Sequence, residues 1–289
     1  MNVVKMSDKF PSNELCMLEV QGNVATIHMN RSEVFNALNT QLITELIQNI
    51  QWTTDRSVSK NSCLRDSEDS EYLRVVVLTA EGKHFCAGAD INMMRDAGTR
   101  SVEDNRIDSE RLDKLFYGLW AHPCFTIGCI QGVALGGGAG LVSCLDYVIG
   151  ESKTRIALSE AKLGILPAVI GPYVYRKVGS AQFRRLSMMA SRISAKEALR
   201  IGFANEVVDT NESFKSSVEK IINEVMSTGP MAISEAKKLT LIFDRWNGDD
   251  FELRQFTLDK TSEMRGSKEG QEGLSSFLER RRPNWSSEE

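Results

Sequence analysis

Residues 125–144 read FTIGCIQGVALGGGAGLVSC. The apolar run 125–130 is typical of a strand covered on both faces. Glycines at 136–138 and 140 predict a tight helix over 137–144, entered directly from the sheet and presenting free N–H groups at its positive end. Leu141 stands where G-x-G-x-x-G needs its last glycine, and the P-loop Lys-Ser/Thr is missing, so dinucleotide and nucleoside-triphosphate sites are excluded. Close helix packing is the other explanation for these glycines, and both stay open.

The uncharged run 123–145 is also long enough to span a bilayer. Gln131 and the glycines would make a poor lone helix in lipid. A buried strand followed by a buried helix fits better, so we expect no membrane span.

The flanking sequence alternates strand and helix patterns. Strands are expected over 15–20, 24–29, 75–78, 147–150 and 205–208, with a hairpin turn at 21–23. Helices are expected after Asn39, over 102–120, and after Ser194, where Glu197 completes a capping box. Only helices follow residue 211: 212–227, 230–246, 249–263 and 268–281. The pattern predicts a parallel α/β core over 1–208, with 53–71 as an exposed polar insertion loop, and a helical C-terminal domain over 209–289.

Composition narrows the function. Of the 289 residues, 42% are hydrophobic and 26% are charged, as is ordinary for soluble globular proteins. The net charge of −4 gives no overall positive electrostatic field that would attract nucleic acid or anionic lipid. Six cysteines without a C-x-x-C pair indicate a reducing compartment, and three scattered histidines predict no metal site. The first residues carry no clear targeting signal and the SSEE end is no peroxisomal tripeptide. Localisation stays open between mitochondrial matrix and cytoplasm.

Two further segments carry chemistry. KHFCAGADI (83–91) follows a buried strand, and its small residues can point a free N–H at a ligand, although an ordinary strand-to-helix turn is the better explanation for this segment taken alone. In ALSEAKLGILP (157–167), Glu160 lies among apolar residues, where burial would raise its pKa and suit it to proton transfer. A lone glutamate is more often a surface residue or a helix cap.

Together, in this order and spacing, the three segments resemble the enoyl-CoA hydratase/isomerase (crotonase) superfamily. The resemblance extends from Val24 to Trp285 and includes FNAL (35–38), RISAKEA (192–198) and EGLSSFLERR (272–281). Within the family, GAGL (138–141) with ALSEAKLG (157–164) looks most like the methylglutaconyl-CoA hydratase branch. The resemblance implies a spiral of ββα units with a helical trimerisation domain. It also implies a homotrimer or a dimer of trimers, and no cofactor, since coenzyme A is part of the substrate.

Site residues follow from the resemblance by position. The N–H groups of Ala89 and Gly137 would hold the thioester enolate, and Glu160 would be the general acid/base. The adenine and pantetheine contacts would lie at Arg31, Phe35, Ala37, Ala87, Asp90 and Ile91. Phe277 and Arg280 would reach the CoA of a neighbouring subunit, although without the resemblance a solvated helix end is the preferred explanation for the arginine.

Gly140 is the main departure, because hydratases of the family carry a first glutamate there. The leading function is therefore hydration of a branched or carboxylated 2-enoyl-CoA, such as 3-methylglutaconyl-CoA. For its distal carboxylate, Arg95 and Lys162 are candidate cations, although ordinary surface charges are the stronger explanation for both. An enoyl-CoA delta-isomerase working with Glu160 alone is the alternative. An acyl-CoA binder without activity and an RNA-binding protein are the competing classes, and the absence of a basic stripe disfavours the last.

Overall fold

The computed structural model describes residues 5–7 and 9–286. Its main sheet has the strand order β1-β2-β3-β4-β6-β9. β1 and β2 form the expected antiparallel hairpin around Gly22, whose φ of 57° suits glycine, and the later neighbours pair in parallel. The strands are β1 (Cys16–Gln21), β2 (Val24–Met29), β3 (Val75–Ala80), β4 (Phe125–Ile130), β6 (Tyr147–Glu151) and β9 (Glu206–Val208).

A smaller sheet carries the segments that follow β4 and β6. It has the order β5-β7-β8, with β5 (Val133–Leu135), β7 (Arg155–Ala157) and β8 (Ile193–Ser194). An isolated bridge between Cys86 and Ala134 joins it to the segment after β3. The two glycine-rich segments singled out in the sequence are therefore paired directly.

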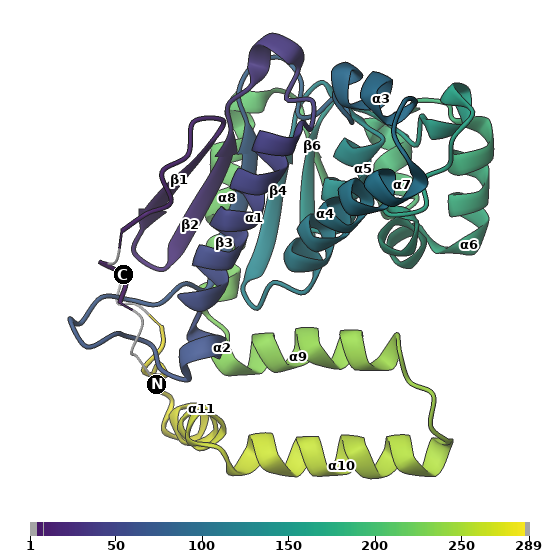
Figure 1. The fold of residues 1–289 in the computed structure, drawn as a ribbon. Helices are drawn as coiled ribbons and strands as arrows, with labels where there is room; N and C mark the ends of the chain where they lie inside the picture. The colour runs from purple at the N-terminus through teal and green to yellow at the C-terminus, as the bar shows by residue number, and fades with distance from the viewer. Residues whose placement is uncertain (1–4, 8, 287–289) are drawn as a thin grey trace.

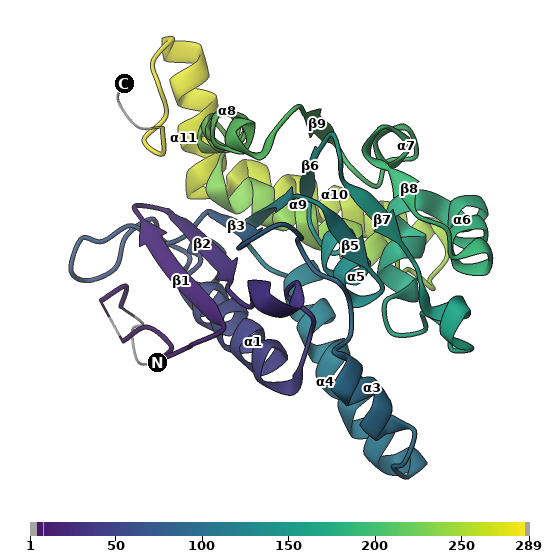
Figure 2. The ribbon, with the colours of Figure 1, turned by 90° about the horizontal axis from the view of Figure 1, so that it is seen from above.

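Helices cover both faces of the main sheet (Figures 1 and 2). α1 and α4 pack against one face and α8 against the other, where Ile221 and Val225 belong to one apolar cluster with Val75, Val77 and Ile127. α8 thus belongs to the sheet's packing, although it falls in the predicted C-terminal domain. The helices are α1 (Thr40–Asp55), α2 (Val58–Asn61), α3 (Ile91–Ala97), α4 (Val102–Trp120), α5 (Gly137–Ser143), α6 (Gly171–Met189), α7 (Ala195–Arg200), α8 (Phe214–Met226), α9 (Pro230–Phe243), α10 (Asp250–Gly266) and α11 (Lys268–Glu279). The described residues also contain three 3-10 turns: η1 (Ser32–Val34), η2 (Glu160–Leu163) and η3 (Asn211–Ser213).

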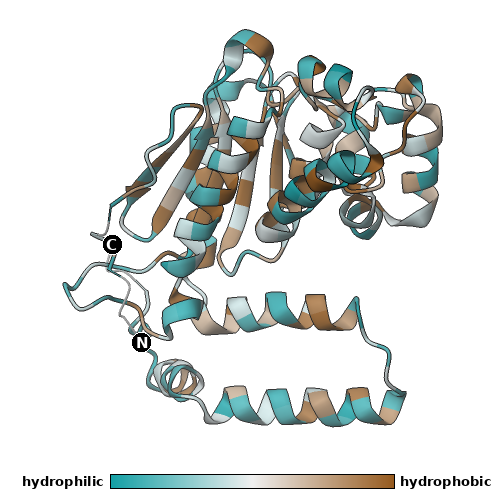
Figure 3. Cartoon of the chain, in the orientation of Figure 1, coloured by the Kyte–Doolittle hydropathy of each residue, from teal (hydrophilic) through white to brown (hydrophobic). Residues whose placement is uncertain are grey.

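The last three helices extend away from the sheet (Figure 1). None of the described residues of α10 is buried, and Phe251 and Leu258 on it are exposed. Figure 3 shows α10 as a mixture of hydrophilic and hydrophobic residues rather than a wholly polar helix. α9 is tied to the core by Lys237, which pairs with Asp146 at 2.6 Å.

Most sequence predictions of elements are confirmed, including the strand over 125–130, the helix over 102–120 and the Asn39 cap, whose side chain accepts from Leu42 N. The prediction of an exposed loop over 53–71 is wrong at its start. There α1 continues to Asp55, α2 follows, and Thr53 and Val58 are buried. Thr53 Oγ1 lies 2.9 Å from the buried ring of His122, a distant partner that satisfies a polar side chain in the core.

The capping box at Ser194 is wrong in its second half. Ser194 Oγ accepts from Glu197 N as expected, but the Glu197 carboxylate pairs with Arg185 and Arg200 instead of returning to the cap. Two charged partners hold that carboxylate more strongly than one backbone N–H.

The uncharged run folds as β4, β5 and α5, and none of the helices in the described residues is long and apolar enough to cross a membrane. Cys86, Cys124, Cys129 and Cys144 are buried, and so is Cys16. Burial raises the pKa of the first three to about 12, so these thiols behave as small apolar groups. The predictions about targeting signals rest largely on residues 1–4, 8 and 287–289, outside the described residues.

Candidate active site

The segments after β3 and β4 are joined backbone to backbone. Cys86 N donates to Val133 O at 3.0 Å, and Leu135 N donates to Cys86 O at the same distance. A Cβ added at Gly88 would lie 2.8 Å from Leu135 O and 3.8 Å from Gly137 N. At its φ of 99°, Gly88 therefore brings the Ala89 backbone close to the start of α5.

This junction leaves two backbone donors free. Leu38 pairs with the backbone on either side of Ala89: Leu38 N donates to Gly88 O, and Leu38 O accepts from Asp90 N. The N–H of Ala89 itself takes no part in this pairing. Gly137 is the first residue of α5, where an N–H has no partner within the helix. Neither N–H donates to any residue that the structure describes. Free backbone donors on adjacent loops can stabilise a developing oxyanion when both point at the same oxygen.

Glu160 reaches the same junction from η2. A Cβ at Gly136 would lie 3.2 Å from Glu160 Oε1. Glu160 Oε2 is shielded from solvent and has no hydrogen-bond partner among the described residues. Burial raises the pKa of Glu160, as its apolar surroundings predict, and its own backbone N–H opposes the shift. The site thus holds a half-buried carboxyl with a free oxygen, suited to accepting and returning a proton.

The space beside Gly140 is filled. A Cβ there would lie 2.4 Å from Ile170 Cγ2 and 3.0 Å from Phe116 Cε1, and both of these side chains are buried. Glu160 is therefore without a carboxylate partner from position 140, and the geometry leaves no room for one. Sequence reasoning missed Ile170, because nothing local marks a contact across 30 positions.

Arg31, Ala37 and Asp90 are brought together beside these loops. Arg31 Nη1 donates to Asp90 Oδ2 at 2.7 Å and to Ala37 O at 2.8 Å. Asp90 also accepts from Asn92 N and caps α3. Burial acts to raise the pKa of Asp90, but the Arg31 pair and the α3 N–H groups outweigh it and hold that pKa below its ordinary value.

Phe35 and Asn36 form an unusual left-handed turn, with φ of 57° and 53°. Ala87 N donates to Phe35 O at 2.9 Å, and the half-exposed Phe35 ring meets His84 edge-on. Asn36 is fully buried. Its Oδ1 accepts from Arg31 N, while its Nδ2 donates to Glu81 O and His84 O. Asn36 thereby links the turn after β2 to residues 81–84, which lead to the Ala89 donor. Sequence reasoning missed this role, although asparagine is a residue type that tolerates this backbone conformation.

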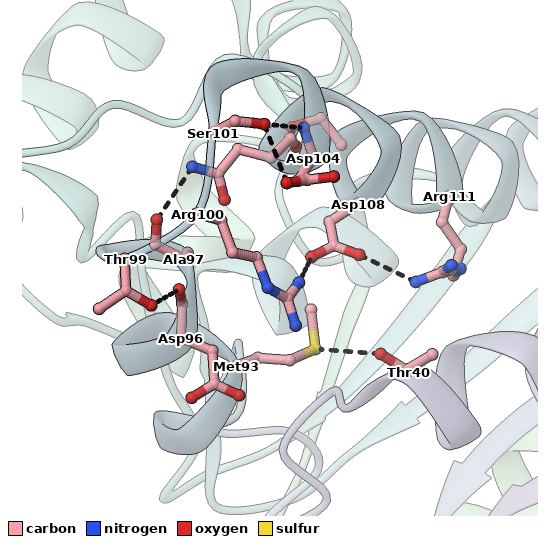
Figure 4. Close-up of polar contacts among 12 residues, drawn as sticks. Thr40, Met93, Asp96, Ala97, Thr99, Arg100, Ser101, Asp104, Asp108 and Arg111 are labelled. Atoms are coloured by element: carbon pink, nitrogen blue, oxygen red, sulfur yellow. Dashed lines mark hydrogen bonds and ion pairs between the residues drawn. The ribbon is translucent and has the colours of Figure 1, made fainter.

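The α3 side of the site is open. None of the described residues of α3 is buried, and Ile91 is 75% exposed. Figure 4 shows the local contacts that hold this corner: Asp108 receives Arg100 at 2.6 Å and Arg111 at 2.9 Å, and Thr40 Oγ1 reaches Met93 Sδ at 3.8 Å. Arg95 on α3, which contacts Asn92, and Lys162 on η2 are both exposed.

Phe277 and Arg280 lie elsewhere. They belong to the end of α11, which both ribbon views place at the opposite end of the molecule from α3 and α5 (Figures 1 and 2). Phe277 is 81% exposed. One chain alone therefore does not bring them to the site, and the role predicted for them in a neighbouring subunit stays a prediction.

The described residues line two sizeable cavities, of which only the smaller adjoins the candidate site. An apolar one of about 600 Å³ adjoins η2 and is lined by Ala161, Ile165, Leu166, Tyr175, Phe183 and Met188. A larger one of about 1330 Å³ lies between α8 and β1–β3, where none of the predicted site residues lines it. Convergent chemical groups, rather than cavity size, locate the candidate site.

Comparisons with known proteins identify the family that the chain is similar to. A family model described as "Enoyl-CoA hydratase/isomerase" matches residues 19–288. The chain is 30% identical to the short-chain-enoyl-CoA hydratase of Clostridium acetobutylicum, over 92% of this chain and 95% of that one. It is 27% identical to a putative enoyl-CoA hydratase of Thermus thermophilus, over 93% and 100%.

Solved structures are also similar. An enoyl-CoA hydratase from Shewanella pealeana superposes with a TM-score of 0.85 at 32% identity, covering 95% of this chain and 97% of that one. A putative enoyl-CoA hydratase/isomerase (crotonase) from Legionella pneumophila gives 0.81 at 33% identity, covering 94% and 99%.

Proposed function

This chain belongs to the enoyl-CoA hydratase/isomerase family, and from that premise we propose that it adds water to a 2-enoyl-CoA thioester. The observation that carries the proposal is the buried, unpartnered Oε2 of Glu160 beside the Gly136–Gly137 turn. It supports a mechanism in which Glu160 transfers the proton while neighbouring backbone donors stabilise an enolate.

One carboxyl is enough for a balanced addition. The Glu160 carboxylate takes a proton from water as the water oxygen bonds to C3. The electron pair of the double bond then moves onto the thioester oxygen, where the N–H groups of Ala89 and Gly137 stabilise it. Glu160 returns the proton to C2, which restores the carboxylate. Burial favours the neutral carboxyl that forms midway, in agreement with the raised pKa of this group.

For the acyl group, we propose a branched or carboxylated chain such as the 3-methylglutaconyl group. Support comes from the filled position 140, which differs from a two-glutamate site. The exposed Arg95 and Lys162 are the cations available beside the loops for a distal carboxylate. Replacing either cation should raise the KM for the carboxylated substrate and leave that for crotonyl-CoA unchanged.

Isomerisation of a 3-enoyl-CoA is the second candidate, favoured by the same filled position. A single carboxyl can move a proton from C2 to C4 without water. A panel of crotonyl-, 3-methylcrotonyl-, 3-methylglutaconyl- and 3-hexenoyl-CoA separates the two. Hydration removes the absorbance of the conjugated thioester, whereas isomerisation creates it.

The purified parent and Glu160→Gln should be assayed side by side on this panel. Turnover of a 2-enoyl-CoA by the parent, lost in the variant, supports hydration. Appearance of conjugated product from 3-hexenoyl-CoA alone would instead assign the isomerase. Binding of every ester without turnover would leave an acyl-CoA binder and overturn both activities.

We propose a homotrimer or a dimer of trimers, in which Phe277 and Arg280 approach the CoA of a neighbouring subunit. The exposed apolar residues of α10 and α11 support this, because large uncovered apolar surfaces mark interfaces. Light scattering should give three or six chain masses. A monomer with unchanged CoA affinity would contradict the arrangement.

A further inference from the structure

We infer that Ile170 is a specificity-determining residue, which closes the volume beside Gly140 and commits the site to a single carboxyl. The inference rests on the proposed function, because it concerns the acid/base groups of that same reaction. It deepens that proposal by naming the side chain responsible for the departure at position 140.

The contact is too close for any side chain at position 140. The hypothetical Cβ would meet Ile170 Cγ2 at 2.4 Å and Ile170 Cβ at 3.1 Å, both on the rigid, branched part of the side chain. Cβ atoms in folded proteins essentially never approach a neighbour within 3.0 Å. A glutamate there would have to displace Ile170 altogether.

Ile170 is not free to move aside. It is 4% exposed and belongs to the main apolar core, which also contains Phe116, Leu141 and Val174. Ile170 O accepts from Tyr173 N and Val174 N at the start of α6. Packed cores absorb added atoms only at a cost in stability, so Ile170 acts as a fixed stop against α5.

The stop acts on the element that supplies the proposed donor. Gly140 lies one turn after Gly137 on α5, and Gly140 N donates to Gly136 O at 3.0 Å. Phe116 contacts the same face, since its Cζ would lie 3.9 Å from a Cβ at Gly137. Ile170 and Phe116 therefore hold the donor helix on its apolar side, while Glu160 works alone beside Gly136.

Removing the stop should make room for a second carboxyl. Ile170→Gly deletes both close contacts, and Ile170 is the N-cap of α6, a position where glycine is tolerated. The contact with Phe116 Cε1 at 3.0 Å then needs only a small shift of one ring. The pair Gly140→Glu and Ile170→Gly is accordingly the decisive combination, with Gly140→Glu/Ile170→Val as the matched control that keeps the branched stop.

The experiment measures thermal unfolding and the pH dependence of kcat/KM for crotonyl-CoA and 3-methylcrotonyl-CoA in the parent, both single variants, the double variant and the control. We expect Gly140→Glu and the control to unfold at lower temperature than the parent and to lose activity at least tenfold. The double variant should recover folding relative to Gly140→Glu and hydrate crotonyl-CoA at least tenfold faster than it. Its pH profile should show two ionisations where the parent shows one, because two neighbouring carboxyls titrate as a pair.

Three outcomes would overturn the inference: Gly140→Glu as stable and active as the parent, equal rescue by Val and Gly at 170, or a folded double variant with one ionisation and no gain. If the parent hydrates none of the esters, the proposed function fails by itself. The unfolding temperatures then still test whether positions 140 and 170 compete for one volume.

Discussion

The two loops that supply the proposed oxyanion donors differ in how they are held. The segment that supplies the Gly137 donor, α5 with the turn before it, is closely packed. Six of the seven residues of α5 are buried, and neighbouring atoms fill the space beside Gly138 and Gly140. The segment that supplies the Ala89 donor, residues 83–90, leads into α3. None of the described residues of α3 is buried, and the helix is held by its Asp90 cap and by surface contacts (Figure 4). The Gly137 donor therefore begins a buried helix, whereas the Ala89 donor lies between the buried Cys86 and an exposed helix.

This difference separates two tasks. The packed side decides the chemistry, because it fixes Gly137 and leaves no space for a second carboxyl. The open side has exposed side chains such as Ile91 and can adapt to the acyl group without disturbing the core. Substitutions should therefore affect catalysis most on the packed side and binding most on the open side.

The largest effect is expected at the carboxyl itself. Glu160→Gln removes proton transfer but keeps the shape of the side chain, so kcat should fall by about 100- to 10,000-fold. KM should stay within a few-fold, because binding rests on backbone and CoA contacts. Steady-state kinetics on the best ester of the panel measures both. A variant turning over at the parent rate would remove Glu160 from the mechanism.

Paired glycine substitutions test the comparison directly. A Cβ at Gly138 would lie 2.5 Å from Cys86 O, so Gly138→Ala must push α5 away from the segment that carries Ala89. Loss of one oxyanion donor typically lowers kcat by about 100- to 1,000-fold, and we expect a loss of that order.

Gly98→Ala, at the end of α3, is the control, because its Cβ would meet nothing closer than 3.4 Å. It should keep parent kcat and unfolding temperature. Equal effects of the two substitutions would show that the two sides are held alike.

Asn36→Ala tests the link between the turn after β2 and residues 81–84, which lead to the Ala89 donor. It leaves Glu81 O and His84 O without their buried donor, and we expect a loss of about 1–3 kcal/mol of stability together with a lower kcat/KM. Asn61→Ala, which also removes two amide bonds to backbone carbonyls, is a control on α2, far from the site in Figure 1. It should lower stability without changing kcat/KM, and equal kinetic losses would make Asn36 merely structural.

The smallest effect concerns pH and stability. The folded pKa of Glu160 is raised by burial, so its contribution is fully present below the unfolded pKa and is lost as pH rises through the folded pKa. Glu160→Gln stays neutral throughout. Its unfolding temperature should slightly exceed that of the parent at neutral pH, and the difference should vanish below the ordinary glutamate pKa of about 4.3. A variant that is less stable at neutral pH would contradict the burial of an unpartnered carboxyl.

Much of the fold was predictable because its signals are local. Apolar runs gave β3, β4 and β6, a Gly-Asn turn gave the β1–β2 hairpin, and Asn39 gave the start of α1. The prediction of an exposed loop over 53–71 was wrong at its start because the polar side chain of Thr53 is buried and hydrogen-bonds to His122, which is distant in the sequence. The carboxylate of Glu197 likewise pairs with Arg185 on another helix and does not form the capping interaction expected from the sequence.

The sequence by itself determined the strands, the helices, and the glycine-rich and glutamate segments of the candidate site, because composition and periodicity act between neighbours in the chain. Only the tertiary structure decided that Asn36 joins two loops and that Ile170 fills the place beside Gly140. Both depend on residues far apart in the chain meeting at atomic distances. No local pattern encodes such contacts, since close packing is fixed only when all the elements are in place.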